Sequence, residues 1–280
     1  MGVRLAKAAP PLLVMGIMIL CCCGGGDAST FDSRFVVLGP SLVEIMFRCG
    51  LGERIAGVDR YSDWPPEVAG IPNVGGYLDP SLESIAALSP TSIHMSGDSP
   101  VLRELAEDLG IPCYSYGFDS LEGVFAALDS LDARYGARAA EFRSDLETTL
   151  DSLRLELSEV VPLDVLVVIY HEYGSSSMTV AGGGTYFADI LERLGCRISA
   201  PGSGAWPMVS AEGAVSLGPD HVILLFPGGR DPEGTRHRER AFWEGLGFHE
   251  SRIHCIFEPY MMVPGGRLES IAEDICSCLL

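Results

Sequence analysis

Two stretches of the sequence carry the same chemistry-bearing residue types at a constant offset of 129 positions. Each stretch runs from an aromatic residue, through a Ser-x-Glu motif that opens a helical pattern, to a proline and an apolar run. The aligned pairs are Tyr77 with Trp206, Ser81 with Ser210, Glu83 with Glu212, Leu88 with Leu217, Pro90 with Pro219 and Ile93 with Val222. Aromatic faces bury flat apolar molecules with little loss of side-chain freedom. We interpret the stretches as copies of one unit, each presenting an aromatic ring and a carboxylate.

Two histidines offer a second kind of chemistry. His94 and His171 each lie at the end of an apolar run predicted to be a parallel strand. Ligands of open α/β sheets bind beyond the carboxyl ends of the strands. A neutral imidazole there can coordinate a transition metal, and Glu172 adds a carboxylate beside His171. No close-spaced ligand set like that of zinc enzymes occurs, so an ordinary hydrogen-bonded histidine is the alternative.

Catalytic motifs do not occur in the sequence. There is neither a Ser nucleophile elbow nor an HExxH pattern. The glycine run 182–184 lacks the lysine of a phosphate-binding loop. We therefore predict that the protein is not an enzyme.

Alternating strand and helix patterns must position these residues. Strand-like runs cover 35–38, 55–58, 92–95, 112–116, 165–170, 221–226 and 253–257, and helical patterns cover 41–49, 81–88, 101–109, 186–194, 211–217 and 267–279. Such alternation predicts parallel sheets with helical crossovers. We expect an N-terminal α/β lobe over 34–119 and a C-terminal α/β lobe over 162–280.

The segment 120–161 between these lobes has helical periodicity. Its apolar residues recur every three, four or seven positions, and prolines occur only outside it, at Pro112 and Pro162. Gly136 is the candidate break between a short helix and a long one that would span on the order of 35 Å. We expect this long rigid α-helix to join the lobes, with an ordinary pair of packed surface helices as the alternative.

The first thirty residues indicate export. Arg4 and Lys7 precede an apolar stretch, 10–20, that has the length of a signal-peptide core and is too short for a comfortable transmembrane helix. The mature protein is therefore expected outside the cytoplasmic membrane, in a compartment that permits disulfides. The sequence does not decide between a disulfide from Cys196 to Cys276 or Cys278 and buried free thiols.

Three consecutive cysteines after the apolar stretch resemble the bacterial lipoprotein pattern. That pattern gives a signal peptide over 1–23 with Cys23 as the lipidated residue. Cys21 or Cys22 as the acceptor, and a plain cleaved signal, are the alternatives. Residues 24–33 are then expected to form a flexible tether.

Charge excludes two classes of partner. The formal net charge of the 280 residues is −19. Nucleic acid requires a basic footprint, and an anionic lipid surface attracts basic segments. We therefore expect no nucleic-acid partner, and contact with the membrane only through the lipid anchor.

Six segments carry a further pattern. They are Phe35 to Ile45, Gly50 to Gly52, Val58 to Glu67, Val74 to Glu83 and, more weakly, Trp206 to Glu212 and Pro264 to Arg267. Together they resemble the cobalamin and ferric-siderophore substrate-binding proteins of bacterial ABC importers. The resemblance implies two α/β lobes joined by a rigid helix, with the ligand held in the cleft between them.

The resemblance also implies roles for individual residues. Tyr61, Tyr77 and Trp206 match positions that hold a corrin-like disc. Further ligand candidates are Trp64, His94, His171, Arg267 and the methionines Met178, Met208, Met261 and Met262. Packing within a lobe is the alternative for each aromatic residue.

Glu83 and Glu212 match paired surface glutamates that dock on arginines of the permease, one in each lobe. The alternative is purely structural. A glutamate in the first turn of a helix is favoured by the helix dipole, and Ser210 can serve as an N-cap.

We predict that this protein is an extracytoplasmic lipoprotein that captures a cobalamin-type corrinoid and delivers it to an ABC permease with its ATPase. We expect a monomer with no resident cofactor or metal and only small lobe closure. Ferric siderophore or haem is the main alternative. Siderophore complexes favour basic residues in the cleft, where only Arg60, Arg230 and Arg267 are expected. A zinc- or manganese-binding protein and a hydrolase are less favoured.

Overall fold

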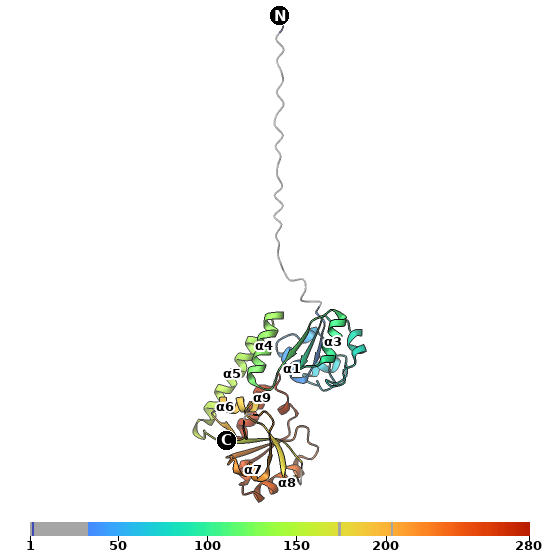
Figure 1. Cartoon of the computed structure of the whole chain (residues 1–280). Coiled ribbons are helices and arrows are strands. Elements are labelled where there is room, and N and C mark those ends of the chain that lie inside the picture. Colours follow the sequence, from blue (N-terminus) through green and yellow to red (C-terminus); the bar gives the residue numbers. More distant parts are fainter. Residues whose placement is uncertain (1, 3–32, 173–174, 203) are drawn as a thin grey trace.

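The computed structural model describes residues 2, 33–172, 175–202 and 204–280. Two β-sheets, each with helices packed around it, are connected by a pair of helices (Figure 1). Apart from residue 2, the predicted signal peptide lies outside the described residues, and so do Cys23 and all but the last residue of the predicted tether.

The N-terminal sheet is parallel and has the strand order β2-β1-β3-β4. Its strands are β1 (Phe35–Leu38), β2 (Ile55–Val58), β3 (Ser92–Ser96) and β4 (Cys113–Tyr116), and its helices are α1 (Pro40–Arg48), α2 (Leu82–Ala87) and α3 (Pro100–Leu109). All four residues of β1 are buried, as expected for a central strand covered on both faces.

The C-terminal sheet has the order β10-β9-β5-β6-β8, and β7 also pairs with β5. Its strands are β5 (Asp164–His171), β6 (Ser177–Val180), β7 (Arg197–Ile198), β8 (Met208–Ser210), β9 (His221–Leu225) and β10 (Ile253–Ile256), and its helices are α6 (Tyr186–Leu194), α7 (Ala211–Ser216), α8 (Pro232–Gly245) and α9 (Leu268–Leu279). Strands β5, β9 and β10 are parallel, whereas β6 and β8 are antiparallel. The predicted α/β fold class is confirmed, and the antiparallel edge was not expected.

The predicted internal copies appear in the structure with the same element bounds. Helix α2 and strand β3 coincide with α7 and β9 when the sequence is shifted by 129 positions. Ser81 caps α2 by accepting a hydrogen bond from the Ser84 backbone, and Ser210 caps α7 by accepting one from the Gly213 backbone. The repeated Ser-x-Glu motif is therefore a repeated helix start.

The segment between the sheets forms two helices. Helix α4 (Leu121–Tyr135) ends at Gly136, which has a left-handed conformation with φ 61°, and α5 (Ala139–Glu156) follows. A 3-10 turn, Leu157–Glu159, then ends the helical segment. The expected break at Gly136 is therefore present, and α5, at 1.5 Å per residue, spans about 27 Å, shorter than the roughly 35 Å expected for the long helix.

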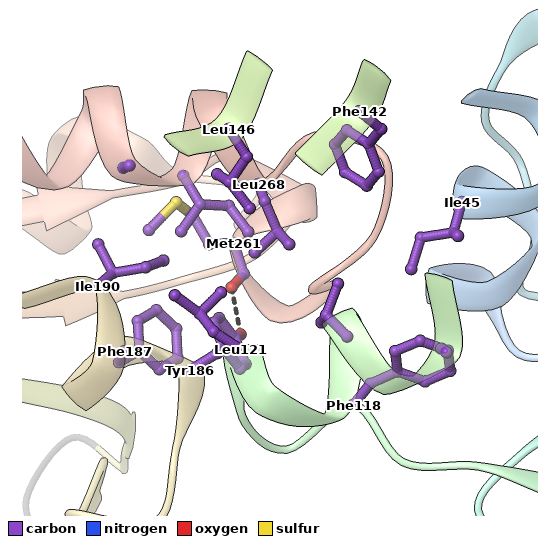
Figure 2. Packing of buried hydrophobic residues seen from close by; sticks show 14 of the residues in the cluster. Ile45, Phe118, Leu121, Phe142, Leu146, Tyr186, Phe187, Ile190, Met261 and Leu268 are labelled. Atoms are coloured by element: carbon purple, nitrogen blue, oxygen red, sulfur yellow. Dashed lines mark hydrogen bonds between the residues drawn. The ribbon is translucent and has the colours of Figure 1, made fainter. Parts of the chain in front are cut away.

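One hydrophobic core extends from the N-terminal sheet through α4 and α5 into the C-terminal lobe. Figure 2 shows Ile45 of α1, Phe142 of α5 and Leu268 of α9 in this cluster. The Tyr186 hydroxyl donates a hydrogen bond to the Met261 carbonyl inside it, at 2.6 Å. Because close-packed interiors resist deformation, this shared core restrains motion of one lobe against the other.

The six cysteines among the described residues are free thiols, so the Cys196 bridge considered from the sequence is not formed. Four of these thiols have a pKa raised to between about 11 and about 12 by burial. Within the described ranges, no helix combines the length and the apolar character that a membrane crossing requires.

Candidate functional site

A cavity of about 430 Å³ lies between the lobes, at the carboxyl ends of the N-terminal strands. Three glycines line this end of the sheet: Gly39 directly follows β1, Gly97 follows β3 and Gly117 follows β4. Parallel sheets bind ligands where the strand order reverses, and here that point lies between β1 and β3. Since glycine has no side chain, this floor leaves the backbone open to a broad, flat ligand.

Aromatic side chains from both lobes form the walls of the cavity. Tyr61 and Tyr77 come from the N-terminal lobe, whereas Tyr186 and Trp206 come from the C-terminal lobe. Tyr61 is 61% exposed and Trp206 is 39% exposed, so both offer free surface to a ligand. Met262 adds a polarisable thioether. The structure thus brings the expected residues Tyr61, Tyr77 and Trp206 together around one cavity.

Tyr77 has a fixed position beside the glycine floor. Its hydroxyl donates a hydrogen bond to the Asp98 carbonyl at 3.0 Å. Burial, assisted by the nearby Asp98 carboxylate, raises the pKa of Tyr77, so the phenol is neutral. Gly97 has φ 71°, and a Cβ atom there would lie 2.9 Å from the Tyr77 hydroxyl oxygen. The glycine therefore makes room for the ring.

The electrostatics of the cavity are acidic. Among the described residues that line it are two carboxylates, Asp59 and Asp119, and no Arg, Lys or His. An anionic ligand would lose its hydration in this cavity, and no cation of the described lining would compensate for that loss. The lining favours a neutral or cationic ligand.

Asp59 directly follows β2 and is 1% exposed. Its Oδ2 accepts hydrogen bonds from the Gly39 backbone N and from the Ser62 hydroxyl, both at 2.7 Å. Its Oδ1 accepts one from the Tyr61 backbone N at 2.8 Å. One buried carboxylate thus connects the floor of the cavity to its wall.

The glycine floor and Asp59 were not predicted from the sequence. The available signal was positional: a glycine comes directly after two of the apolar strand runs, at Gly39 and Gly117, Gly97 comes one residue beyond a third run, and Asp59 comes directly after a fourth. Single glycines and acids at strand ends are common turn residues, so this signal becomes specific only once the strand order is known.

Trp64 and Arg267 lie in the contact between the lobes and do not line the cavity. The Arg267 guanidinium pairs with Glu44 of α1, with 2.5 Å between Nη2 and Oε1. It also lies 4.8 Å from the Trp64 ring centroid and 4.9 Å from that of Tyr260. The expectation that Trp64 and Arg267 contact the ligand is not met, because both join one lobe to the other.

Glu44 is 1% exposed, and burial raises its pKa although the Arg267 guanidinium acts in the opposite direction. A neighbouring pair repeats this connection, since Arg48 of α1 contacts Glu269 of α9 at 2.7 Å. Two salt bridges between α1 and the start of α9 therefore hold the lobes together beside the cavity.

His94 lies in the middle of β3 and is fully buried within the N-terminal lobe. Its Nδ1 lies 3.1 Å from the Tyr116 hydroxyl, and its Nε2 lies 2.9 Å from Ser92 Oγ and 3.1 Å from the Tyr135 hydroxyl. Burial, with a smaller contribution from the Arg134 charge, lowers the pKa of His94 to about 3. His94 is therefore a neutral packing residue, and the expectation that it faces the ligand is corrected.

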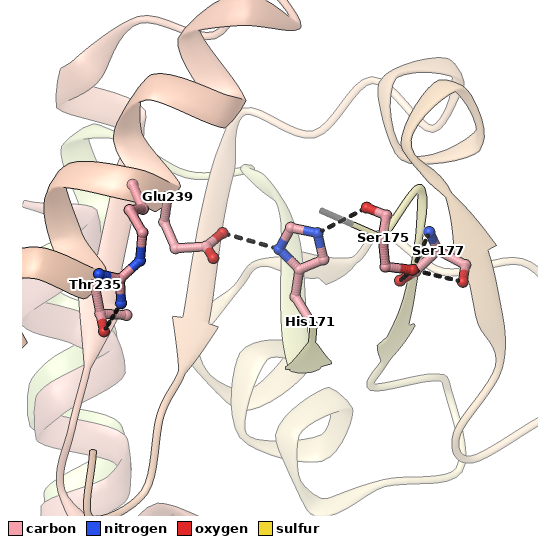
Figure 3. Close-up of polar contacts among 6 residues, drawn as sticks. His171, Ser175, Ser177, Thr235 and Glu239 are labelled. Atoms are coloured by element: carbon pink, nitrogen blue, oxygen red, sulfur yellow. Dashed lines mark hydrogen bonds and ion pairs between the residues drawn. The ribbon is translucent and has the colours of Figure 1, made fainter. Parts of the chain in front are cut away.

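His171 is the last residue of β5, but its side chain turns toward α8 (Figure 3). Its Nδ1 lies 3.0 Å from Glu239 Oε2, and its Nε2 lies 3.3 Å from the Ser175 carbonyl. Both partners are acceptors, and the hydrogen bond to Glu239 raises the pKa of His171 against the effect of burial. His171 is a buried, charge-paired residue outside the cavity lining, which corrects its predicted ligand role.

The remaining predicted residues occupy the surface or the core. Glu83 and Glu212 are both exposed, in the first turns of α2 and α7. Met178 and Met261 are buried, whereas Met208 is 71% exposed. Within the described ranges, no group of three or more His, Cys, Asp or Glu residues is arranged to hold a metal ion.

A larger surface groove, of about 900 Å³, lies along α4, α5 and α6. Paired charges occupy part of it, as in Arg143 with Asp129 at 2.6 Å. The cavity between the lobes is smaller, but it alone of the two combines strand ends with aromatic walls. We therefore take the interlobe cavity as the candidate site.

Residues 35–235 match the model of a protein family described as periplasmic binding protein. The vitamin B12-binding protein of Pectobacterium atrosepticum is 24% identical over 262 residues, which cover 90% of each chain. These matches confirm the resemblance that the sequence segments indicated.

Solved structures share the fold. The periplasmic vitamin B12-binding protein of Vibrio cholerae superposes with a TM-score of 0.70 at 20% identity, covering 88% of this chain and 96% of that one. A periplasmic haem-binding protein of Pseudomonas aeruginosa gives a TM-score of 0.71 at 24% identity, covering 88% of this chain and 92% of that one. Because proteins with both kinds of ligand match equally well, the fold alone does not select the ligand.

Proposed function

The chain belongs to the periplasmic binding protein family, and we propose that it captures a cobalamin-type corrinoid and delivers it to the permease of an ABC importer. Members of this family bind a solute outside the cytoplasm and are not enzymes. The choice of ligand rests on the chemistry of the interlobe cavity.

The shape of the cavity supports a flat macrocycle. A corrin ring is a broad, mostly apolar disc, and it can lie on the strand ends at Gly39, Gly97 and Gly117, where no side chain stands in its way. Tyr77 on one side and Trp206 on the other would cover its edges and faces. The cavity volume falls within the range of pockets for small molecules, and its open side leaves space for the parts of a corrinoid outside the ring.

Charge is the observation that carries the proposal. Haem has two propionates and many ferric siderophores are anionic, and such ligands are held by Arg or Lys. The described lining has no cation and two carboxylates. The amide groups around a corrin ring need no cation, and its cobalt centre carries positive charge. A corrinoid therefore fits this lining better than haem or a ferric siderophore.

Delivery requires docking and a fixed position at the membrane. We propose that Glu83 and Glu212 dock on arginines of the permease, since both are exposed on equivalent helices of the repeated unit. Lipidation of Cys23 would anchor the protein, with lobes over 34–119 and 162–280 extending from it. Charge reversal of either glutamate should reduce uptake without changing ligand affinity.

Titration of the purified protein with cyanocobalamin, followed by calorimetry and absorbance, tests the proposed ligand. We expect one-to-one binding that is at least about 30-fold weaker for Trp206→Ala, because the aromatic wall that the C-terminal lobe offers to the ligand is lost. The matched control is Leu155→Ala, an exposed residue of α5 outside the cavity. Tight binding of haem without binding of cyanocobalamin would assign the site to haem and overturn the proposal.

A further inference from the structure

We propose that Asp59 is a positioning residue of the binding site, which holds the floor glycine and the wall tyrosine in their binding geometry. The inference rests on the proposed function, because it explains how the ligand cavity is prepared before ligand arrives. Asp59 contacts the floor of the cavity through the Gly39 backbone and the wall through the Tyr61 backbone.

The Asp59 carboxylate is buried and fully hydrogen-bonded. Asp59 is 1% exposed and has no cation among its hydrogen-bond partners, which are two backbone N–H groups and one hydroxyl. A buried charge is costly unless it is fully hydrogen-bonded. All three bonds are 2.7 to 2.8 Å long, the length of charge-assisted bonds. The carboxylate is therefore a strong fixed anchor.

Asp59 holds the backbone of Gly39, at the floor of the cavity. Gly39 follows β1 and has φ 119°, a conformation that side-chain-bearing residues rarely adopt. A Cβ atom at this glycine would collide with Ser96 Oγ, so the strand ends of β1 and β3 approach closely here. The bond from Gly39 N to Asp59 ties this floor position to the end of β2.

Asp59 also holds Tyr61, which is the most exposed aromatic residue of the cavity wall. Because 61% of the residue is accessible and the Arg60 guanidinium lies 6.0 Å from the ring centroid, packing around the ring restrains it only weakly. The Tyr61 backbone N donates to Asp59 Oδ1, so the anchor sets the direction in which the side chain leaves the backbone. A cavity wall that already has its binding geometry binds the ligand more tightly, because less conformational entropy is lost on binding.

Asp59→Asn tests the anchor, because asparagine keeps the size of the side chain but turns one acceptor into an N–H donor that faces another donor. We expect cyanocobalamin affinity to fall about tenfold, as for the loss of a charge-assisted buried bond. Asp63→Asn is the matched control: it removes the same charge from an exposed residue of the same segment and should bind as the wild type does.

A double-mutant cycle separates positioning from general destabilisation. If Asp59 acts through Tyr61, Asp59→Asn should weaken binding by less than about threefold when Tyr61→Ala is already present. Equal weakening in both backgrounds would overturn the positioning of Tyr61 by Asp59, and wild-type affinity of Asp59→Asn would overturn the whole proposal.

Amide hydrogen exchange provides a readout that needs no ligand. Asp59→Asn should accelerate exchange at the Gly39 and Tyr61 amides by at least about tenfold, while amides of the distant helix α8 exchange at the wild-type rate. Unchanged exchange at both amides would overturn the anchor. If the wild type binds no cyanocobalamin while the two amides respond, the proposed ligand is wrong and the anchor stands.

Discussion

The N-terminal lobe leaves the carboxyl ends of its strands open, whereas the C-terminal lobe fills the matching places with its own side chains. Strand β3 is followed by Gly97 and β4 by Gly117. In the C-terminal lobe, β9 is followed by Phe226 and β10 by Phe257, and these two rings stack with 5.7 Å between their centroids. Gly97 and Phe226 align at the 129-residue offset, so one copy of the repeated unit ends in an open glycine and the other in a packed ring.

The two lobes also differ in the surroundings of their buried histidines. His94 in β3 is neutral, among hydroxyl groups and aromatic rings. His171 at the end of β5 forms a buried pair with Glu239 and contacts Phe242, with ring centroids 4.7 Å apart. The C-terminal lobe therefore keeps a buried charge pair at the end of β5, outside the cavity lining, and it reaches the cavity with Tyr186 at the start of α6 and with Trp206, Met262 and Pro264.

The largest expected effect is on the stability of the C-terminal lobe. Glu239→Ala leaves the His171 imidazole buried without its carboxylate, so the free energy of unfolding should fall by about 3 to 5 kcal/mol. Affinity for cyanocobalamin should stay within about threefold of wild type, because the pair does not line the cavity. Urea denaturation and calorimetric titration measure the two quantities.

The exposed Glu244 of the same helix provides the control, and Glu244→Ala should change stability by less than about 0.5 kcal/mol. A large loss of ligand affinity in Glu239→Ala, at temperatures where the protein is folded, would remove the distinction between a binding lobe and a supporting lobe.

The contact between the lobes should show the next largest effect. Arg267→Met leaves the Glu44 carboxylate buried and unpaired, which should cost about 2 to 3 kcal/mol of unfolding free energy near neutral pH. The pKa of Glu44 is already raised by burial, so protonation should relieve part of the loss at lower pH. A loss that is equal at about pH 5 and about pH 8 in urea denaturation would contradict this account.

The two histidines predict opposite pH dependence. The folded pKa of His94 is about 3, below the unfolded value, so its contribution to stability is present above about pH 6.5 and is lost as pH falls toward 3. The folded pKa of His171 is raised, so its contribution is complete below about pH 6.5 and is lost as pH rises through the folded pKa.

Urea midpoints of His94→Asn and His171→Asn, compared with wild type from about pH 5 to about pH 8, measure these slopes. The stability gap between wild type and His94→Asn should widen with rising pH, and the gap for His171→Asn should narrow, each by at most about 1.4 kcal/mol per pH unit. Slopes of the same sign would contradict the assignment of one neutral and one charged histidine.

The smallest expected effect compares one glycine from each lobe. Gly97 has φ 71° and Gly228 has φ 69°, so alanine at either position should cost about 1 kcal/mol of stability. Only at Gly97 would the new Cβ meet a neighbour, the Tyr77 hydroxyl oxygen at 2.9 Å, whereas the space at Gly228 is open. Gly97→Ala should therefore weaken cyanocobalamin binding severalfold and Gly228→Ala should not. Equal affinities in calorimetric titration would argue against the glycine floor.

The sequence was sufficient for the repeated unit and for Tyr61, Tyr77 and Trp206 around the cavity, but it did not identify Tyr186 as a lining residue. Strand and helix periodicity is a local property, and Tyr77 and Trp206 keep their places within copies that share element bounds. Helix α8 was missed because its sequence is strongly charged, with only Glu239 and Trp243 buried. Amphipathic periodicity is weak in such a helix.

The errors at His171 and Arg267 have a different origin. The pairing of β5 with β6 is irregular between Val168 and Tyr170, so simple alternation along the strand does not give the direction of the His171 side chain. Arg267 finds its partner Glu44 at a separation of 223 residues, and no local pattern specifies such a contact. Side-chain direction near irregularities, and pairing between lobes, require the assembled fold.

A crystal structure of the protein with cyanocobalamin tests the central claim most directly. The account predicts that the corrin ring lies between the lobes, in van der Waals contact with Gly39, Gly97 and Gly117 and covered by Trp206. A corrin ring seated instead on Phe226 and Phe257, at the strand ends of the C-terminal lobe, would contradict it.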